Sequence, residues 1–180
     1  EVDFDEDSCA TNVCKNGGTC TSTLHGPQCH CPLQFRGRQC EEEALVEVPG
    51  FVGHSYLVHA LPNRTLDEDE FRVRMSFRTS REEGLLFYAG GGGRQMFAAA
   101  YIQSGILTLK ISCGNQVILF ADPRHRIDTG YLQNLDVRVF VEDSVCRTAI
   151  ELNETNTMKG EQEVDAAPSI PDRLYIGMVP

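Results

Sequence analysis

The stretch "EEGLLFYAGGGGRQMFAAAYIQSGILTLKI", residues 82–111, decides the fold class, because four consecutive glycines separate two apolar runs. A phosphate-binding loop would end in Gly-Lys-Ser/Thr and open a helix whose N-terminus faces the anion. Here Arg94 and Gln95 follow the glycines, and "MFAAAYIQSG" leads into another strand pattern. The lysine, the hydroxyl and the helix of that motif are missing. We therefore predict that Gly90–Gly93 form a turn between two strands and bind no phosphate.

The alternation of apolar and polar residues also indicates a sheet protein. It is clearest in "FRVRMSFR" (71–78), and "ILTLKI" (106–111) and "LDVRVFVE" (135–142) repeat the same period of two. This period is typical of half-buried antiparallel strands, and no segment sustains a helical stripe. We predict an all-β fold in which many short strands form a sandwich of two antiparallel sheets.

The cysteines are unevenly distributed, since six lie between Cys9 and Cys40 and only Cys113 and Cys146 follow. A segment of about 40 residues cannot bury enough surface to fold without cross-links. Six cysteines in it therefore predict three disulfides and an oxidising compartment. Zinc is a weaker interpretation, because the chain has no CxxC pair. The spacing alone does not choose among the many connectivities.

Charge and hydropathy exclude several partners. The formal net charge of −10 argues against nucleic acid and against anionic membranes. No apolar run reaches the roughly 20 residues that span a bilayer. The chain opens with acidic "EVDFDEDS" and shows neither an initiator Met nor a signal peptide. We interpret it as a fragment of a longer protein that is secreted or is the ectodomain of a membrane protein.

The first six cysteines, the "NGGTC" motif and the "CxC…G…C" ending resemble an EGF-like module over residues 9–40. The resemblance implies an EGF-like module at 8–41, followed by a short acidic junction at 42–50. It also implies an O-fucose acceptor directly before the third cysteine, which is Thr19 here. The implied disulfides are Cys9–Cys20, Cys14–Cys29 and Cys31–Cys40.

The stretches "FRVRMSFRTSREEGLLFYAG", "MFAAAYIQSGILTLKI" and "DRLYIGMVP" resemble a laminin G-like domain. The resemblance implies a jelly-roll sandwich over residues 51–180. The chain departs from the family pattern in having no Trp for its "DG.WH" motif and Met178 in place of a glycine. The family usually continues with a further strand and a cysteine. We therefore expect the domain to be incomplete at its C-terminal end and to lack its last strand.

Both resemblances raise the question of calcium. Calcium-binding EGF-like modules place acidic residues before the first cysteine, where Asp5 and Asp7 fit. A calcium ligand of laminin G-like domains is an Asp at the place of Met96, and a thioether is a poor ligand for calcium. The EGF-like positions that depart from the calcium-binding pattern are Ser8, Ser22 and Pro27. We expect no calcium, no other metal and no cofactor.

No enzymatic activity is expected. A Ser/His/Asp set can be drawn from Ser55, His59 and Asp67, but no GxSxG turn or oxyanion device accompanies it. The carboxylates cluster in runs such as "DEDE" and "EEE", which are more often solvated surface than acid–base pairs.

Two kinds of surface site remain. Asn63 and Asn153 lie in the N-glycosylation triplets "NRT" and "NET", which predict exposed loops. Arg72, Arg74 and Arg78 share the outer side of a predicted strand, and guanidinium groups suit the sulfate and carboxylate of acidic glycans. The alternative is an ordinary solvated strand face, which the net charge of −10 favours.

The two late cysteines, Cys113 and Cys146, are predicted to form a disulfide, because exported proteins seldom leave two thiols free. In the alternative, Cys146 pairs with a cysteine beyond Pro180, and Cys113 is then a free thiol. Taken together, these features predict a non-catalytic interaction and spacer unit of an adhesion or matrix protein. Its sandwich would bind a protein or cell-surface glycan partner. The alternative function is a receptor-activating ligand that signals through the EGF-like module.

Overall fold

The computed structural model describes residues 9, 13–51, 55–90, 95–114 and 116–177. Every regular element in these residues is a strand, which confirms the all-β prediction. None of the described residues belongs to a helix that could span a membrane. The expectations for Asp5, Asp7, Ser8, Gly91–Arg94 and Met178 fall outside the described residues.

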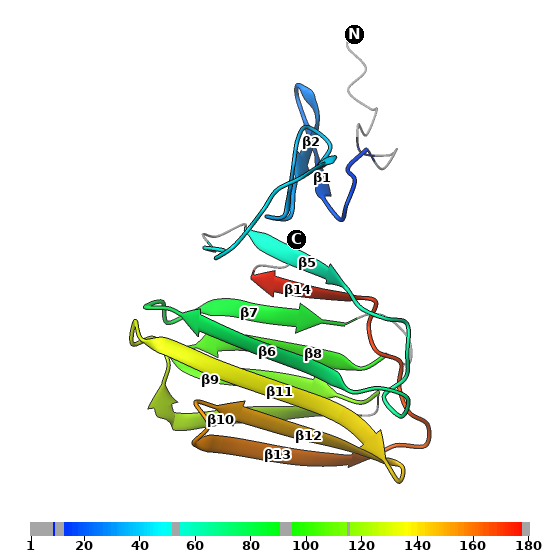
Figure 1. Ribbon diagram of the computed structural model, residues 1–180, viewed down its shortest axis with the longest axis vertical. Helices are drawn as coiled ribbons and strands as arrows, with labels where there is room; N and C mark the ends of the chain where they lie inside the picture. The colour runs from blue at the N-terminus through cyan, green and yellow to red at the C-terminus, as the bar shows by residue number, and fades with distance from the viewer. Residues whose placement is uncertain (1–8, 10–12, 52–54, 91–94, 115, 178–180) are drawn as a thin grey trace. The chain divides into compact units, whose positions relative to one another are not determined.

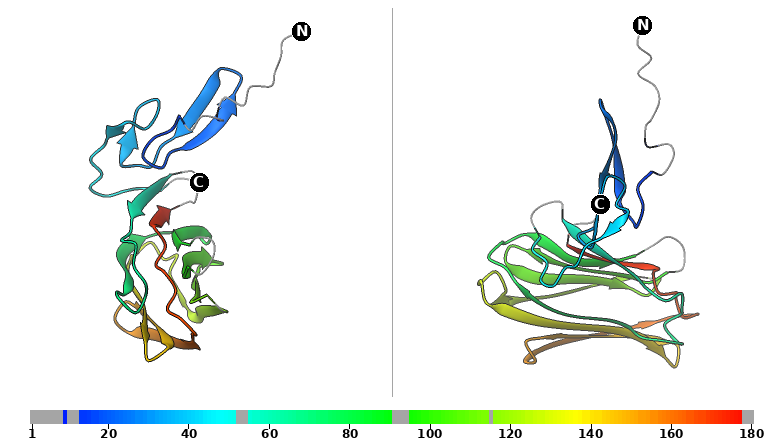
Figure 2. Two further views of the ribbon diagram at one scale, coloured as in Figure 1. Left: turned by 90° about the vertical axis from the view of Figure 1, so that its right-hand side faces the viewer. Right: turned by 45° about the horizontal axis from the view of Figure 1, so that its top comes forward.

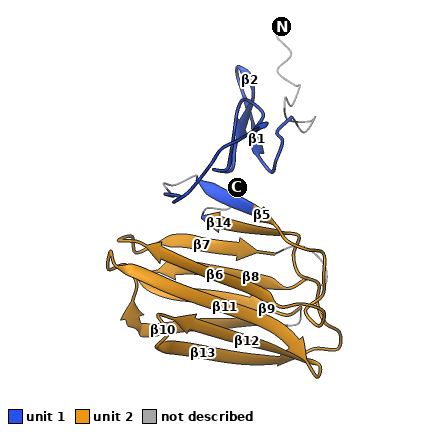
Figure 3. Ribbon diagram, viewed as in Figure 1, with its two compact units in different colours: residues 1–58, 177–180 blue, residues 59–176 orange. Residues whose placement is uncertain are grey.

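The chain divides into two compact units, as Figure 3 shows in colour. The first unit comprises residues 1–58 and 177–180, and the second comprises residues 59–176. The boundary between Val58 and His59 falls within strand β5 (Tyr56–Ala60), so that strand contributes to both units.

The first unit contains two small antiparallel pairs. Strands β1 (Thr19–Thr23) and β2 (Gly26–His30) form a hairpin, and β3 (Phe35–Arg36) pairs with β4 (Glu42–Glu43). Few apolar side chains are buried in this unit; they include Cys14, Cys40 and Tyr56. So small a core cannot offset the entropy of folding, which is why disulfides are needed here.

The second unit is a sandwich of two sheets that pack face to face (Figures 1 and 2). The four-stranded sheet has the order β13-β12-β11-β6 and the six-stranded sheet the order β10-β9-β8-β7-β14-β5. The first sheet consists of β6 (Phe71–Arg78), β11 (Leu132–Glu142), β12 (Val145–Leu152) and β13 (Asn156–Glu163). Besides β5, the second consists of β7 (Gly84–Ala89), β8 (Phe97–Gln103), β9 (Ile106–Ser112), β10 (Val117–Arg126) and β14 (Arg173–Gly177).

The predicted alternation places the core between the two sheets. In each strand the apolar residues of one face point inward, and the remaining face is exposed or half-buried. Of the four inward residues of β6, Phe71 and Val73 are buried, whereas Met75 and Phe77 are only partly buried against the core. The same alternation places seven further residues inward, of which Val141 is only partly buried. The structure buries the other six: Leu107, Leu109, Ile111, Leu135, Val137 and Val139.

Tight turns fix the register of the hairpins. Ser104 and Gly105 join β8 to β9 with φ values of 53° and 78°, and Asp143 and Ser144 join β11 to β12 with 52° and 61°. Two consecutive residues with positive φ match the right-handed twist of the flanking strands. Strands β7 and β8, which precede and follow the glycine-rich segment in the sequence, pair antiparallel.

The edge strands β10 and β13 of the two sheets contact each other. A Cβ atom on Gly160 of β13 would lie 2.6 Å from a ring atom of Phe120 in β10. Glycine is therefore required for this approach, because any side chain would displace a buried ring.

Candidate functional site

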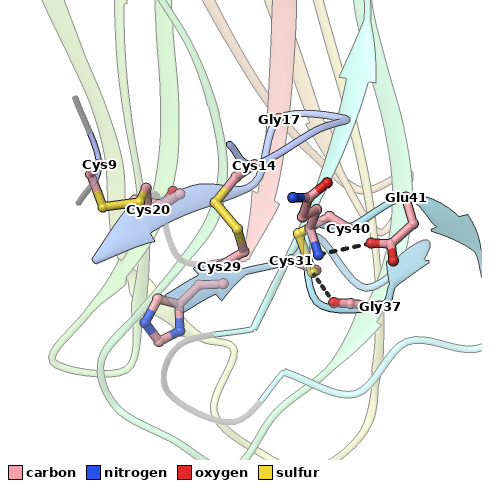
Figure 4. The surroundings of a disulfide bond; sticks show 12 residues. Cys9, Cys14, Gly17, Cys20, Cys29, Cys31, Gly37, Cys40 and Glu41 are labelled. Atoms are coloured by element: carbon pink, nitrogen blue, oxygen red, sulfur yellow. Dashed lines mark hydrogen bonds between the residues drawn. A yellow bond between two sulfur atoms is a disulfide. The ribbon is translucent and has the colours of Figure 1, made fainter. Parts of the chain in front are cut away.

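Four disulfides cross-link the chain, and they join the same pairs that the sequence analysis names. Cys9–Cys20, Cys14–Cys29 and Cys31–Cys40 lie in the first unit, with Cα separations of 5.8, 5.6 and 5.3 Å (Figure 4). Cys113–Cys146 lies in the second unit with a Cα separation of 6.4 Å, within the range that a disulfide spans. Every described cysteine is paired, so the alternative of a free Cys113 does not hold in this structure.

Tyr56 completes the small core of the first unit. Its side chain is 2% exposed, and its hydroxyl lies 3.1 Å from the carbonyl oxygens of both Gly17 and His30, which share its single hydrogen. The same hydroxyl is 3.5 Å from Oγ1 of Thr19, which is half-buried. An enzyme that modifies Thr19 must therefore reach a group that Tyr56 partly covers. The O-fucose site stays a prediction.

Carboxylates already engage two of the three arginines of the predicted acidic-glycan patch. Arg72 donates two hydrogen bonds to Asp136, at 3.0 and 2.6 Å, and Arg74 donates to the same carboxylate at 3.2 and 3.1 Å. The bonds from Arg72 hold the pKa of Asp136 below its usual range, and Asp136 in turn raises the pKa of Arg72. Arg78 has no ion pair within the described part of the chain. Two of the three guanidinium groups are thus already engaged.

The surroundings of this patch are acidic rather than basic. An open depression of about 500 Å³ lies over β6, β11 and β12. Its polar lining residues are Arg74, Ser76, Asn134, Asp136, Glu151 and Glu154. Three carboxylates face a single guanidinium there, which disfavours an acidic ligand at this place.

Sequence reasoning missed Asp136 and its neighbour Arg138, which pairs with Glu70 at 2.8 Å. The alternation in "LDVRV" places both residues on the outer side of their strand. The missing information was the register, which sets Asp136 opposite Arg74 and Arg138 opposite Arg72.

The outer side of the six-stranded sheet is different in character. One row of directly paired residues crosses five strands, from β14 to β10: Tyr175, Tyr88, Ala99, Lys110 and Leu119. Two further aromatic residues of β8 lie on the same side, Phe97 and Tyr101. We call this surface the aromatic face, and we include the exposed Val117 of β10 and Arg173 of β14 in it.

Ring contacts connect side chains of neighbouring strands on the aromatic face. Tyr88 packs edge-on against Phe97, with ring centroids 5.6 Å apart, and its centroid is 6.3 Å from that of Tyr175. The Lys110 ammonium lies 5.6 Å from the centre of the Tyr101 ring, within range of a cation–π interaction. Leu119 and Val117 at the β10 edge are 60% and 59% exposed, which is high for large apolar side chains.

The aromatic face also carries no acid. Strands β5, β7, β8, β9 and β14 contain no Asp or Glu, and the one acid of β10 is Asp122. The Asp122 carboxylate accepts a hydrogen bond from Asn156 of β13 in the other sheet, so it turns away from this face. No carboxylate forms an ion pair with Lys110 or Arg173 in the described residues. The face therefore combines apolar area with two unpaired cations, in a chain of net charge −10.

The Asp122 cluster is the one histidine–carboxylate pair that the structure brings together in its described part. Asp122 is 9% exposed and accepts from Arg124 at 2.9 Å, and it lies 2.8 Å from Nδ1 of His125. The hydrogen bonds from Arg124 hold the pKa of Asp122 far below its usual range. No group of three metal-ligating side chains occurs among the described residues. This cluster fastens β10 to β13 and offers no nucleophile.

The two predicted N-glycosylation sites differ in their surroundings. Asn63 is exposed and lies between strands, with no side-chain hydrogen bond in the described part. Asn153 is exposed too, but its amide donates to Gln133 at 2.7 Å and its carbonyl accepts from the Asn134 N–H at 2.8 Å. Modification of Asn153 would have to compete with these contacts. Both sites stay predictions.

Calcium, which the two resemblances raise, finds no suitable ligands at Met96. This residue is fully buried in the core, and its backbone N–H donates to the Ser169 carbonyl at 2.9 Å. In the other module, Ser22 and Pro27 face each other in the β1–β2 hairpin. A buried thioether and a proline side chain offer no hard oxygen to calcium at these two positions. The absence of calcium stays a prediction.

Comparison with known proteins assigns the fold to a family. The laminin G domain profile matches residues 77–180, and the EGF-like domain profile matches residues 9–39. This chain belongs to the laminin G domain family. It carries an EGF-like domain ahead of the laminin G domain, as the resemblances implied.

Individual relatives agree with this assignment. Protein eyes shut homolog of Macaca fascicularis is 34% identical over 141 residues, which are 72% of this chain and 4% of that protein. Pikachurin of Bos taurus is 33% identical over 117 residues, 62% of this chain and 11% of that protein. This chain thus spans a small part of the relatives it matches. Domains LG4-5 of the mouse laminin alpha1 chain share the fold, with a TM-score of 0.55 and 18% identity over 76% of this chain and 38% of that structure.

The family, the relatives and the disulfides together place the chain outside the cell. The laminin G domain is an extracellular module of the adhesion type. Among the described residues its two outer faces differ, since the arginines of one mostly form ion pairs with carboxylates, whereas the other is aromatic, free of acid and carries two cations without an ion pair.

Proposed function

We propose that this chain is a non-catalytic binding and spacer unit of an adhesion or matrix protein, and that its sandwich binds a protein or cell-surface glycan partner. One observation carries the proposal: the aromatic face is apolar, cationic and free of acid. Exposed apolar area with tyrosines is characteristic of interface centres, and unpaired cations steer an anionic partner. The family membership and extracellular location support it.

The opposite sheet supports the choice of face. There Arg72, Arg74 and Arg138 each hold a carboxylate, so a ligand would have to break existing ion pairs to gain new ones. Lys110 and Arg173 have no such pairs to break among the described residues. Binding at the aromatic face therefore costs less desolvation and rearrangement.

A binding assay with matched lysine variants tests the proposal. The labelled full chain is applied to a glycan array and to cultured cells, with Lys110→Glu as the variant and Lys159→Glu as its control. Lys159 is an exposed lysine on the outer side of β13 in the other sheet. We expect saturable binding that Lys110→Glu weakens and Lys159→Glu leaves unchanged. Binding that both variants reduce equally, or that neither changes, contradicts the assignment of this face.

A further inference from the structure

The segment between the two modules carries a surface that complements the aromatic face. In "EEEALVEV", residues 41–48, Leu45 is 92% exposed and Val48 is 90% exposed. These two large apolar side chains, three residues apart, give the acidic segment an exposed apolar part. We call residues 41–48 the acidic segment.

Two of the four carboxylates of the acidic segment have partners, and the other two form no ion pair among the described residues. Glu41 accepts a hydrogen bond from the Gln39 N–H at 2.8 Å, and Glu42 forms an ion pair with Arg36 at 3.1 Å. Glu43 and Glu47 are exposed and form no ion pair in the described part of the chain. Two free carboxylates thus flank the exposed Leu45.

The spacing of these groups matches the spacing of the free cations on the aromatic face. Lys110 and Arg173 lie on β9 and β14, which are three strand positions apart in the sheet. Three strand spacings are about 14 Å, and Arg173 lies two residues along β14 from Tyr175, the residue in register with Lys110, so the two cations are about 16 Å apart. Glu43 and Glu47 are four residues apart, which is about 13 Å once the segment, which bends at Glu47 and Val48, becomes extended on docking. Flexible lysine, arginine and glutamate side chains cover the remaining difference.

From this complementarity we infer that the aromatic face binds the acidic segment of a second copy of this chain. Leu45, which lies between the two glutamates, packs between the two cations, against Tyr88 and Ala99. Glu43 and Glu47 meet Lys110 and Arg173. The inference rests on the binding role proposed above and names a partner for it.

A second copy is the occupant that the charges favour. The chain has a net charge of −10, and copies of such a chain repel one another unless opposite charges are locally matched. The acid-free face and the acidic segment supply that local match. An eight-residue segment buries less area than the roughly 1,200–2,000 Å² of a stable interface. Because this area is small, we expect a weak dimer.

Sedimentation velocity of the full chain tests the inference. Between about 5 and 500 µM in low salt, we expect the weight-average mass to rise from monomer to dimer, with a dissociation constant in the micromolar range that is typical of small interfaces. High salt should weaken the dimer, because exposed ion pairs are screened. Lys110→Glu and Leu45→Glu should each raise the dissociation constant at least tenfold.

Two matched variants and one charge reversal sharpen the test. Leu24→Glu changes an 88% exposed leucine outside the acidic segment, and Lys159→Glu changes a lysine of the other sheet. Both should dimerise like the wild type. The double variant Lys110→Glu with Glu43→Lys should recover part of the lost association, whereas either single change weakens it. Far-UV circular dichroism establishes that each variant is folded.

The outcomes separate this inference from the proposed function. A constant monomer mass at all concentrations overturns the inference, as does association that Lys110→Glu and Leu45→Glu leave intact. If the chain stays monomeric while Lys110→Glu still abolishes binding to cells or glycans, the face binds a different partner and the proposed function survives. If Lys110→Glu changes neither readout, both are wrong.

Discussion

The disulfide between Cys113 and Cys146 connects the two sheets of the sandwich, because Cys113 follows β9 and Cys146 lies in β12. The double variant Cys113→Ala/Cys146→Ala removes it. The bridge closes a loop with a sequence separation of 33 residues. For a loop of that size the chain-entropy model gives about 3.7 kcal/mol at 25 °C.

Loss of the two buried sulfur atoms adds a second, smaller effect. The cysteines are 2% and 1% exposed, so each truncation leaves unfilled space that costs about 1 kcal/mol. We therefore expect the double variant to lose about 4–6 kcal/mol in the free energy of unfolding of the laminin G domain. Less chain constraint in the unfolded state should also raise the denaturant m-value.

Urea unfolding followed by far-UV circular dichroism measures this loss, because the chain has no tryptophan to report by fluorescence. The control is Cys31→Ala/Cys40→Ala, which removes a bridge of the first unit and should leave the transition of the second unit in place. A loss of about 2 kcal/mol or less would equal the truncations alone and would refute the entropic role of the bridge. A non-reduced digest that lacks a peptide linking the two cysteines would refute the pairing itself.

Four further outcomes are expected. Tyr56→Phe should destabilise the first unit by about 1–3 kcal/mol in thermal or urea unfolding, because two carbonyl groups lose the hydroxyl that they share. The control Tyr131→Phe, at a 77% exposed position, should change stability by less than about 0.5 kcal/mol. Calorimetry with millimolar calcium should show no saturable heat, and a site of micromolar affinity would contradict the interpretation of Met96. The wild type should elute from heparin at low salt; retention at high salt that Arg74→Glu removes would restore the arginine patch as a glycan site. Asp122 has a lowered pKa in the folded state, so its stabilising contribution is present above its unfolded pKa of about 3.9 and is lost as the pH falls. Asp122→Asn should therefore reduce the loss of unfolding free energy at acidic pH. An unchanged loss would show that the cluster contributes nothing to stability.

The strands and the module order could be predicted from the sequence because both depend on short-range patterns. The period of two in "FRVRMSFR" assigns each residue to the inner or outer side without knowledge of its neighbours. The position of Tyr56 could not be predicted in this way. It lies 16 residues beyond Cys40, the last cysteine of the EGF-like motif, yet its hydroxyl binds carbonyls at Gly17 and His30. Only the folded backbone brings these atoms together.

The two sheet faces show the same limit on the scale of a whole surface. Net charge is a sum over the whole chain and does not say where the charges lie. It favoured the interpretation that the arginines of β6 are ordinary solvated residues. In the structure Arg72 and Arg74 are engaged for a local reason, since the register of β11 sets one carboxylate between them.

The net charge also gives no sign of the aromatic face. Tyr175, Tyr88 and Lys110 come from three strands spread over 88 positions of the sequence, and no local window contains them together. Their neighbourhood is created by strand order, which sequence periodicity does not specify. An acidic chain can therefore hold an acid-free surface, and binding depends on that local distribution of charge more than on its total.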